Sequence, residues 1–149
     1  MSGRLDPLQD ALFDLTGLLN RPQQDDVLLR AAGVDLDRAL FPLLARIDRR
    51  GPLGVVELAD LAGRDYTTVS RQVARLEELG LVARRPGADK RVREAVVTAR
   101  GKTVTAAIDR AREKMLNELF AAWDGDDLAT LVRLLRRFAD DALAYAKQR

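Results

Sequence analysis

The side chains best suited to chemistry lie between residues 67 and 93, and they suit hydrogen bonding to an anionic partner. This stretch carries seven basic residues against three acids. Its first part adds the hydroxyls of Thr67, Thr68 and Ser70, which can bond phosphates or the edges of nucleic-acid bases. Arg71 and Arg75 follow, and an arginine can make a forked bond to guanine O6 and N7. The segment therefore has the composition of a nucleic-acid-binding surface.

A second group of basic side chains falls in a predicted hairpin. Residues 81–85 and 93–98 are typical of two short strands, and residues 86–90 are turn-forming. Only Asp89 and Glu94 oppose the positive charge here. A basic hairpin tip suits the minor groove of A·T-rich DNA, where the negative potential is strong. The basic residues of this hairpin are Arg84, Arg85, Lys90, Arg91 and Arg93.

A helix-turn-helix pattern positions the first group. Residues 55–62 predict a two-turn helix, and Gly63 and Arg64 a turn. A longer helix is expected from residue 66 to about 79, with Asp65 as N-cap and Gly80 as C-cap. On a helical wheel its core-facing side holds Val69, Val73 and Leu76, its outer side Thr67, Arg71, Ala74 and Arg75, and its flanks Thr68 and Ser70. Followed by the hairpin, this order predicts a winged helix-turn-helix.

Further helices are expected on both sides of this unit. The predicted ranges are 5–19, about 26–32 ending at Gly33, about 38–50 with Asp35 or Asp37 as N-cap, 99 to about 123 with Thr98 as N-cap, and 128 onward. Residues 52–54 read as a short extended link. The resulting fold class is mostly α (α+β), with a winged helix-turn-helix DNA-binding domain over 34–102. Residues 1–33 and 103–149 form a helical region whose leucine stripes suit dimerisation.

Composition excludes several classes of function. The chain has no Cys and no His, which removes thiol chemistry, imidazole bases and the usual zinc ligands. Its serines are Ser2 and Ser70 alone, and no glycine-rich phosphate loop is present. We expect no enzyme, no cofactor and no metal. No segment is long and apolar enough to cross a membrane or serve as a signal peptide, so we expect a soluble, cytoplasmic protein without a membrane partner.

These motifs closely resemble the MarR (multiple antibiotic resistance regulator) family of winged-helix transcription factors over residues 35–102. Val56-Glu57-Leu58-Ala59 is similar to the family's helix before the turn, and Thr68 to Val82 to its recognition helix. Asp89-x-Arg91, followed by Thr98 and Gly101, matches its wing signature. The family usually has Leu before that Thr and Pro after it, where this chain has Val97 and Ala99.

The resemblance implies a homodimer that binds double-stranded DNA at an inverted-repeat operator. Thr67, Thr68, Ser70, Arg71 and Arg75 would face the major groove. Arg91 would enter the minor groove, steadied by an ion pair with Asp89, and Arg85, Lys90 and Arg93 would lie beside it. We expect a repressor, with activation left open, and a small-molecule effector is a further partner found for many members.

Two alternatives stay open at this stage. A winged-helix module can bind protein without specific DNA binding, although that reading predicts an apolar recognition surface. The leucine stripes of the terminal helices can also close within one chain as a helical bundle. We favour a dimer because the middle helices already supply the core of the winged unit.

Overall fold

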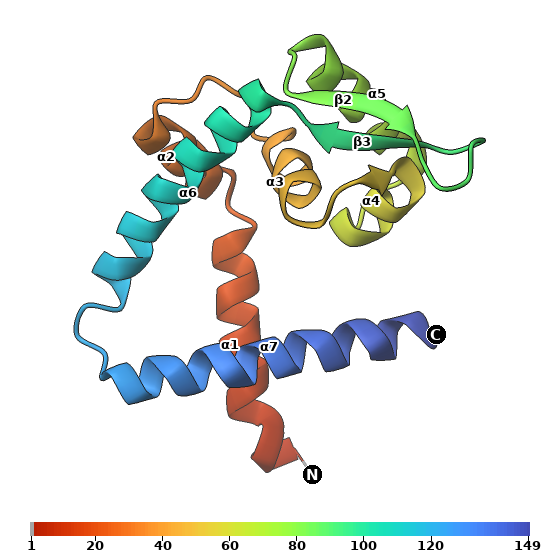
Figure 1. The fold of residues 1–149 in the computed structure, drawn as a ribbon. Coiled ribbons are helices and arrows are strands. Elements are labelled where there is room, and N and C mark those ends of the chain that lie inside the picture. Colours follow the sequence, from red (N-terminus) through yellow and green to blue (C-terminus); the bar gives the residue numbers. More distant parts are fainter. Residues whose placement is uncertain (1) are drawn as a thin grey trace. The chain divides into compact units, whose positions relative to one another are not determined.

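The computed structural model describes residues 2–149, with side chains from Gly3 onward. It is mostly helical with one small sheet, so the predicted fold class is confirmed (Figure 1). The elements are, in order, α1 (Ser2–Leu19), α2 (Pro22–Ala32), α3 (Phe41–Arg50), β1 (Leu53–Gly54), α4 (Val55–Ala62), α5 (Tyr66–Glu78), β2 (Val82–Pro86), β3 (Arg93–Val97), α6 (Ala99–Leu119) and α7 (Gly125–Lys147).

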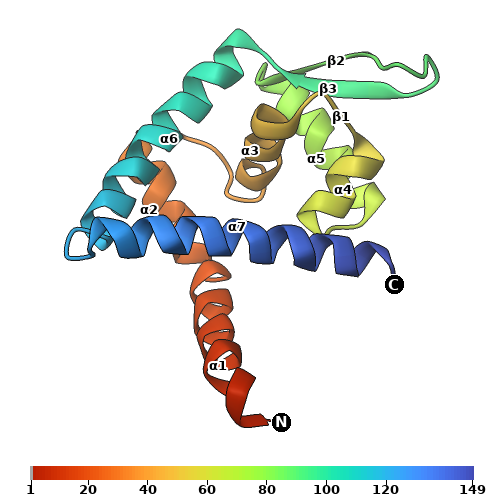
Figure 2. The same cartoon turned by 60° about the horizontal axis from the view of Figure 1, so that its bottom comes forward.

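The sheet has the strand order β1-β3-β2, and both pairings are antiparallel. Val82 pairs with Val97 at one end of the β2–β3 hairpin, and Pro86 pairs with Arg93 toward its tip. Leu53 pairs with Ala95, so the short link expected over residues 52–54 is in part a strand. Figure 2 shows α3, α4 and α5 on one side of this sheet, while the hairpin extends beyond them.

The core lies between the sheet and helices α3, α4 and α5. Leu43 and Leu44 from α3, Leu58 from α4 and Val69 from α5 are fully buried in it. Val73 and Leu76 are also fully buried, which confirms the side of α5 predicted to face the core. Burial of this apolar surface is the main force that holds the winged unit together.

Several predicted helix boundaries differ from the structure, including the starts of α1 and α7, which lie three residues earlier than predicted. The N-cap of α3 is Leu40, and neither Asp35 nor Asp37 caps it; Asp37 instead accepts the Ala39 amide at 2.8 Å in the turn before the helix. Helix α2 starts earlier than expected, because Pro22 occupies its first turn, where a missing amide costs nothing. Helix α6 ends at Leu119, four residues before the predicted end.

The chain divides into two compact units, residues 1–112 and 113–149, and the boundary falls inside α6. The first unit contains the sheet and helices α1 to α5, and the second contains α7. Among the described residues, no helix is long and apolar enough to cross a membrane.

Candidate nucleic-acid interface

The first turn of α5 is fixed by its N-cap. Asp65 accepts the Thr68 amide at 2.9 Å and the Thr68 hydroxyl at 2.7 Å. The backbone bond, and after it the hydroxyl bond, holds the pKa of Asp65 below its usual range, because both favour the carboxylate. The predicted N-cap is therefore correct. At the other end Gly80 has a positive φ of 76°, one residue after the C-cap Leu79, so the predicted C-cap is off by one position.

The outer side of α5 carries the residues predicted to meet DNA. Thr67, Arg71 and Arg75 are exposed, and Ser70 is half-buried at the flank. Arg75 Nη1 lies 3.1 Å from Glu78 Oε2, within the same helix. Arg71 is therefore the more available of the two arginines, because the charge of Arg75 is partly balanced by its neighbour.

Thr68, which was predicted to face DNA from the flank of α5, takes part in the helix cap. Its amide and its hydroxyl both donate to Asp65, so its hydroxyl proton is committed to the helix cap. The hydroxyl oxygen keeps its lone pairs and can still accept a bond. Thr68 thus stabilises the helix start and can meet DNA only as an acceptor.

The wing presents its cations to solvent. Arg91 is 92% exposed, and its Nε lies 3.5 Å from Asp89 Oδ1, the same oxygen that accepts the Arg91 amide at 3.0 Å. Arg85, Lys90 and Arg93 are exposed as well. The turn is closed by two backbone bonds, from Val92 to the Asp89 carbonyl and from Gly87 to the Val92 carbonyl. The tip is thus an ordered turn with one acid beside its outermost arginine.

Arg84 does not belong to this exposed group. Its side chain is only 21% exposed, and its Nε lies 3.9 Å from Glu77 Oε1 on α5. The buried Nε has no hydrogen-bond partner. Arg84 faces the recognition helix across the β2–α5 contact, so it joins the hairpin to α5 and does not extend the basic surface.

Thr98 connects α5, the hairpin and α6. Its hydroxyl donates to the Gly80 carbonyl at 2.6 Å and accepts the Gly101 amide at 3.0 Å, which confirms it as the N-cap of α6. Its own amide donates to the Leu81 carbonyl at 3.1 Å. One residue therefore fixes the end of the recognition helix relative to the start of α6.

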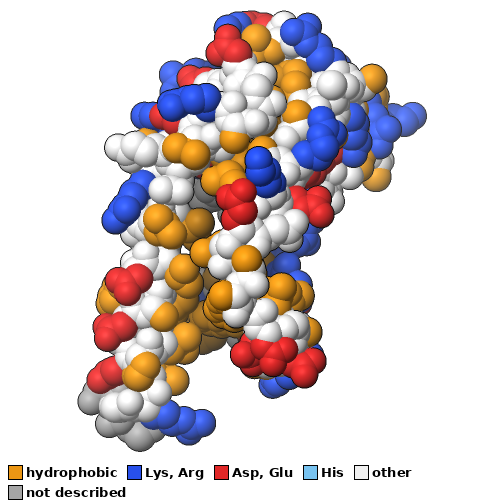
Figure 3. All heavy atoms as spheres, turned by 90° about the vertical axis from the view of Figure 1, so that its left-hand side faces the viewer, with side chains coloured by type: hydrophobic (Ala, Val, Ile, Leu, Met, Phe, Trp, Pro, Cys, Tyr) orange, Lys and Arg blue, Asp and Glu red, His pale blue; other side chains and the backbone are white. Residues whose placement is uncertain are grey.

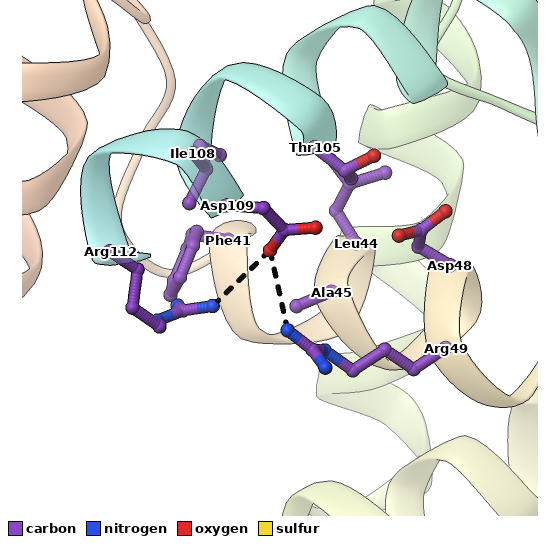
Figure 4. A pocket seen from close by; sticks show the side chains of 9 residues that line it. All are labelled: Phe41, Leu44, Ala45, Asp48, Arg49, Thr105, Ile108, Asp109 and Arg112. Carbon is purple, nitrogen blue, oxygen red and sulfur yellow. Dashed lines mark hydrogen bonds and ion pairs between the residues drawn. The ribbon is translucent and has the colours of Figure 1, made fainter. Parts of the chain in front are cut away.

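An ion cluster and a small cavity lie between α3 and α6 (Figure 4). Asp109 accepts from Arg49 at 3.3 Å and lies 3.5 Å from Arg112. Arg112 also covers the ring of Phe41 at 5.3 Å, and burial lowers its pKa. The cavity measures about 10 Å³, room for one water molecule. Among the described residues, no group of three acids has the arrangement of a metal site.

The sequence did not single out two polar residues that contact each other behind this surface. Arg64, in the turn before α5, donates to the side chain of Gln72 and to the carbonyl of Ala39. The acceptors lie in other segments of the chain, where the periodicity within one helix or strand says nothing, so no pattern in the sequence indicates these bonds. The one hint in the sequence was Gln72, a polar side chain on the flank of α5 that needs a hydrogen-bond partner if it is not in water.

Comparison with known proteins agrees with this geometry. A family model described as HVO_A0114 matches residues 36–98, the winged unit. The HTH-type transcriptional regulator YxaD of Bacillus subtilis is 30% identical over 132 residues, which cover 88% of this chain and 92% of that protein. The regulator YwoH of the same organism is 33% identical over 88 residues, 59% of this chain and 64% of that protein.

Solved structures show the same architecture over nearly the whole chain. The structure of MarR matches with a TM-score of 0.73 and 28% identity, and covers 91% of this chain and 95% of that one. A MarR family protein from Bacillus stearothermophilus matches with a TM-score of 0.77 and 21% identity, covering 93% and 95%. The winged helix-turn-helix fold with its flanking helices is thus shared with known regulators.

Proposed function

The chain belongs to the MarR family of HTH-type transcriptional regulators, and from that premise we propose that it acts as a homodimer on an inverted-repeat DNA operator. In this proposal α5 enters the major groove and the hairpin of β2 and β3 the adjacent minor groove. Repression is the expected outcome, because a protein seated on an operator blocks access to it. The relatives it matches are regulators of transcription, and the proposal includes no enzymatic role.

A single observation carries the DNA-binding part of the proposal. The outward side of α5 and the tip of the hairpin belong to one compact unit, and both expose arginines. Thr67 and Ser70 leave room for a close approach to base edges, and Arg71 can reach them. Arg91, near the tip of the hairpin, is almost fully exposed. A surface of this kind fits two neighbouring grooves of one duplex.

The terminal helices support the dimer. No residue of α7 is buried, although its apolar side chains span about 180° of the helix at 100° per residue. That arc is wider than α7 would need to pack against a single neighbouring helix. Along α1, Leu5, Leu15 and Leu19 are more than half exposed, and Figure 3 shows uncovered apolar side chains on this helix. An exposed face of this size is expected to be covered by a partner.

The same argument addresses the domain assignment. We assign residues 34–102 to DNA binding and residues 1–33 and 103–149 to dimerisation, because the long exposed apolar stripes of α1 and α7 lie in the latter ranges. Family resemblance also implies a small-molecule effector, to which we assign no residues. Since the proposed ligand is chromosomal DNA, the proposal places the protein in the cytoplasm.

The rival function, a winged module that binds only protein, is disfavoured by the surface of α5. Its outer side exposes Thr67, Arg71 and Arg75 and has a half-buried Ala74 as its apolar member. Interfaces between proteins are depleted in charge at their centre, whereas a DNA-binding surface is basic. The observed surface therefore fits DNA better.

The test is fluorescence anisotropy of the purified protein on duplexes selected from a random pool, repeated over a salt series. We expect tight binding that resists nonspecific competitor. The logarithm of the affinity should fall linearly with the logarithm of the salt concentration, with a slope of about −0.9 for each phosphate neutralised. Footprints on the selected duplexes should show an inverted repeat. Absence of binding at low salt, or binding insensitive to salt, would move the assignment to a protein-binding module.

A further inference from the structure

Arg64 lies in the turn between α4 and α5, directly after Gly63, which has a positive φ of 66°. Its Nη1 donates to the Ala39 carbonyl oxygen at 2.7 Å and to Gln72 Oε1 at 2.8 Å. The side chain is partly buried, so water competes weakly for these bonds. One atom of Arg64 therefore joins three segments: the turn, the loop before α3, and the middle of the recognition helix.

We propose that Arg64 is a positioning residue for DNA recognition, which fixes the rotation of α5 through Gln72 and ties α5 to the loop before α3 through Ala39. The proposal rests on the proposed function of α5 as the helix that reads the operator. Arg64 itself is not assigned a contact with DNA.

The physical need for such a residue follows from how α5 is held. Val69, Val73 and Leu76 bury one side of the helix, but apolar burial has no preferred direction and tolerates small rotations. The Asp65 cap fixes the first turn alone. A charge-assisted bond is directional, and Gln72 lies beyond the first turn and directly beside Arg71. The bond from Arg64 thus controls the rotation where the predicted base contact is made.

A small rotation has a large effect at the tip of Arg71. Side chains on a helix extend about 5–6 Å from its axis. A rotation of about 20° moves such a tip by about 2 Å, which exceeds the tolerance of a hydrogen bond to a base edge. Loss of the Arg64 bond is therefore expected to weaken sequence discrimination more than general attraction to DNA.

The surroundings of Gln72 agree with this role. Gln72 and Ala39, the two acceptors, line a hollow of about 470 Å³ between α5 and the 35–40 loop, together with Arg71 and Arg75. Because the oxygen of Gln72 accepts from Arg64, its amide donors are left for the hollow. Leu36 and Leu40 from the loop and Leu79 at the end of α5 also line this space and pack on the core. The bonds from Arg64 add a directional polar link between helix and loop to this apolar contact.

The experiment compares Arg64→Met, Arg64→Lys, Gln72→Met and the Arg64→Met/Gln72→Met double variant with the wild type. Arg50→Met, which changes an exposed arginine in the last turn of α3 that is assigned no contact with DNA or with the partner, is the matched control. Affinity is measured by anisotropy for a selected operator and for a random duplex of equal length, over a salt series. Thermal melting checks that each variant is folded at the assay temperature.

We expect Arg64→Met and Gln72→Met each to lower the operator-to-random affinity ratio by about tenfold, the scale of one charge-assisted bond. The double variant should lose no more than Arg64→Met alone, because the bond that Gln72→Met removes is already absent from Arg64→Met. Arg64→Lys should keep most of the ratio, since an ammonium group has three donors. The salt slope should stay at the wild-type value throughout.

Three results would overturn the proposal. A salt slope reduced by about 0.9 in Arg64→Met, with Gln72→Met unaffected, would make Arg64 a phosphate contact. A lower melting temperature with an unchanged affinity ratio would make the bond merely structural. If the losses in affinity ratio add in the double variant, Arg64 and Gln72 act independently and not through one bond. If Arg64→Met does not fold, Gln72→Met decides alone, and a wild type without operator preference would refute the proposed function instead.

Discussion

Gly101, in the first turn of α6, permits the closest backbone approach in the winged unit. A Cβ at this position would lie 2.1 Å from the Leu81 carbonyl oxygen and 2.6 Å from Cγ2 of Val97. The Leu81 carbonyl cannot withdraw freely, because it accepts the Thr98 amide at 3.1 Å. We therefore predict that Gly101→Ala forces α6 away from the hairpin and destabilises the protein.

The magnitude follows from three contributions. Overpacking against a well-packed backbone costs about 1–3 kcal/mol, and loss of the Thr98–Leu81 bond adds about 1 kcal/mol. Replacing glycine by alanine inside a helix stabilises the helix by about 1 kcal/mol, which offsets part of this cost. The net loss in the free energy of unfolding is about 2 kcal/mol. For a chain of this length that corresponds to a melting temperature lower by about 4–8 °C.

The assay is thermal and urea unfolding followed by circular dichroism at 222 nm, at one protein concentration because a dimer's stability depends on it. Gly17→Ala is the matched control, since a Cβ at Gly17 in α1 would meet nothing within 4 Å. That variant should melt at the wild-type temperature or slightly above it. A Gly101→Ala protein as stable as Gly17→Ala would refute the packing argument.

Further predictions concern DNA binding, assembly and pH. Arg91→Ala should weaken operator binding several-fold in anisotropy without changing the dimer, and unchanged affinity would remove the wing from the interface. Arg71→Ala should cost about 1–3 kcal/mol of binding and relax preference at one operator position; a uniform loss over all sequences would make it a phosphate contact. Leu135→Glu, on the exposed stripe of α7, should shift the protein toward monomer in sedimentation, and an unchanged dimer would place the interface elsewhere. Because its hydrogen bonds lower the pKa of Asp65, this carboxylate stabilises the fold above its unfolded pKa of about 3.9 and loses the effect as the pH falls below it. The stability difference between wild type and Asp65→Ala should therefore shrink from pH 7 to pH 3 in urea unfolding, and a difference that persists would argue against the cap.

Local chemistry made most of the winged unit predictable. Helix α4 has the predicted bounds, because Gly54 and Gly63 flank a short apolar pattern. The buried side of α5 was readable since Val69, Val73 and Leu76 recur at helical spacing. The hairpin followed from a change of period after Gly80 and a turn-forming segment. Each of these signals lies within a few residues of the feature it predicts.

The errors arose where distant segments decide local structure. β1 has two residues, too few for an alternating pattern, and exists because β3 offers it a partner. The α3 N-cap was assigned to an aspartate by residue preference, but the chain makes a further turn at Asp37 first. Thr68 lies on the flank of the wheel, and only the position of the Asp65 carboxylate shows that its hydroxyl is engaged. Arg64 and Gln72 meet through tertiary structure alone.

The recognition helix is held at its middle and at its end by polar bonds to segments outside the helix-turn-helix. At its middle, Arg64 connects Gln72 to the loop that precedes α3. At its end, Thr98 connects the Gly80 carbonyl to the first turn of α6. Since α6 continues into the region that we assign to dimerisation, α5 cannot keep its place while the start of α6 moves. A movement at the start of α6 would therefore reach α5 through the bonds of Thr98, which joins the two helices directly.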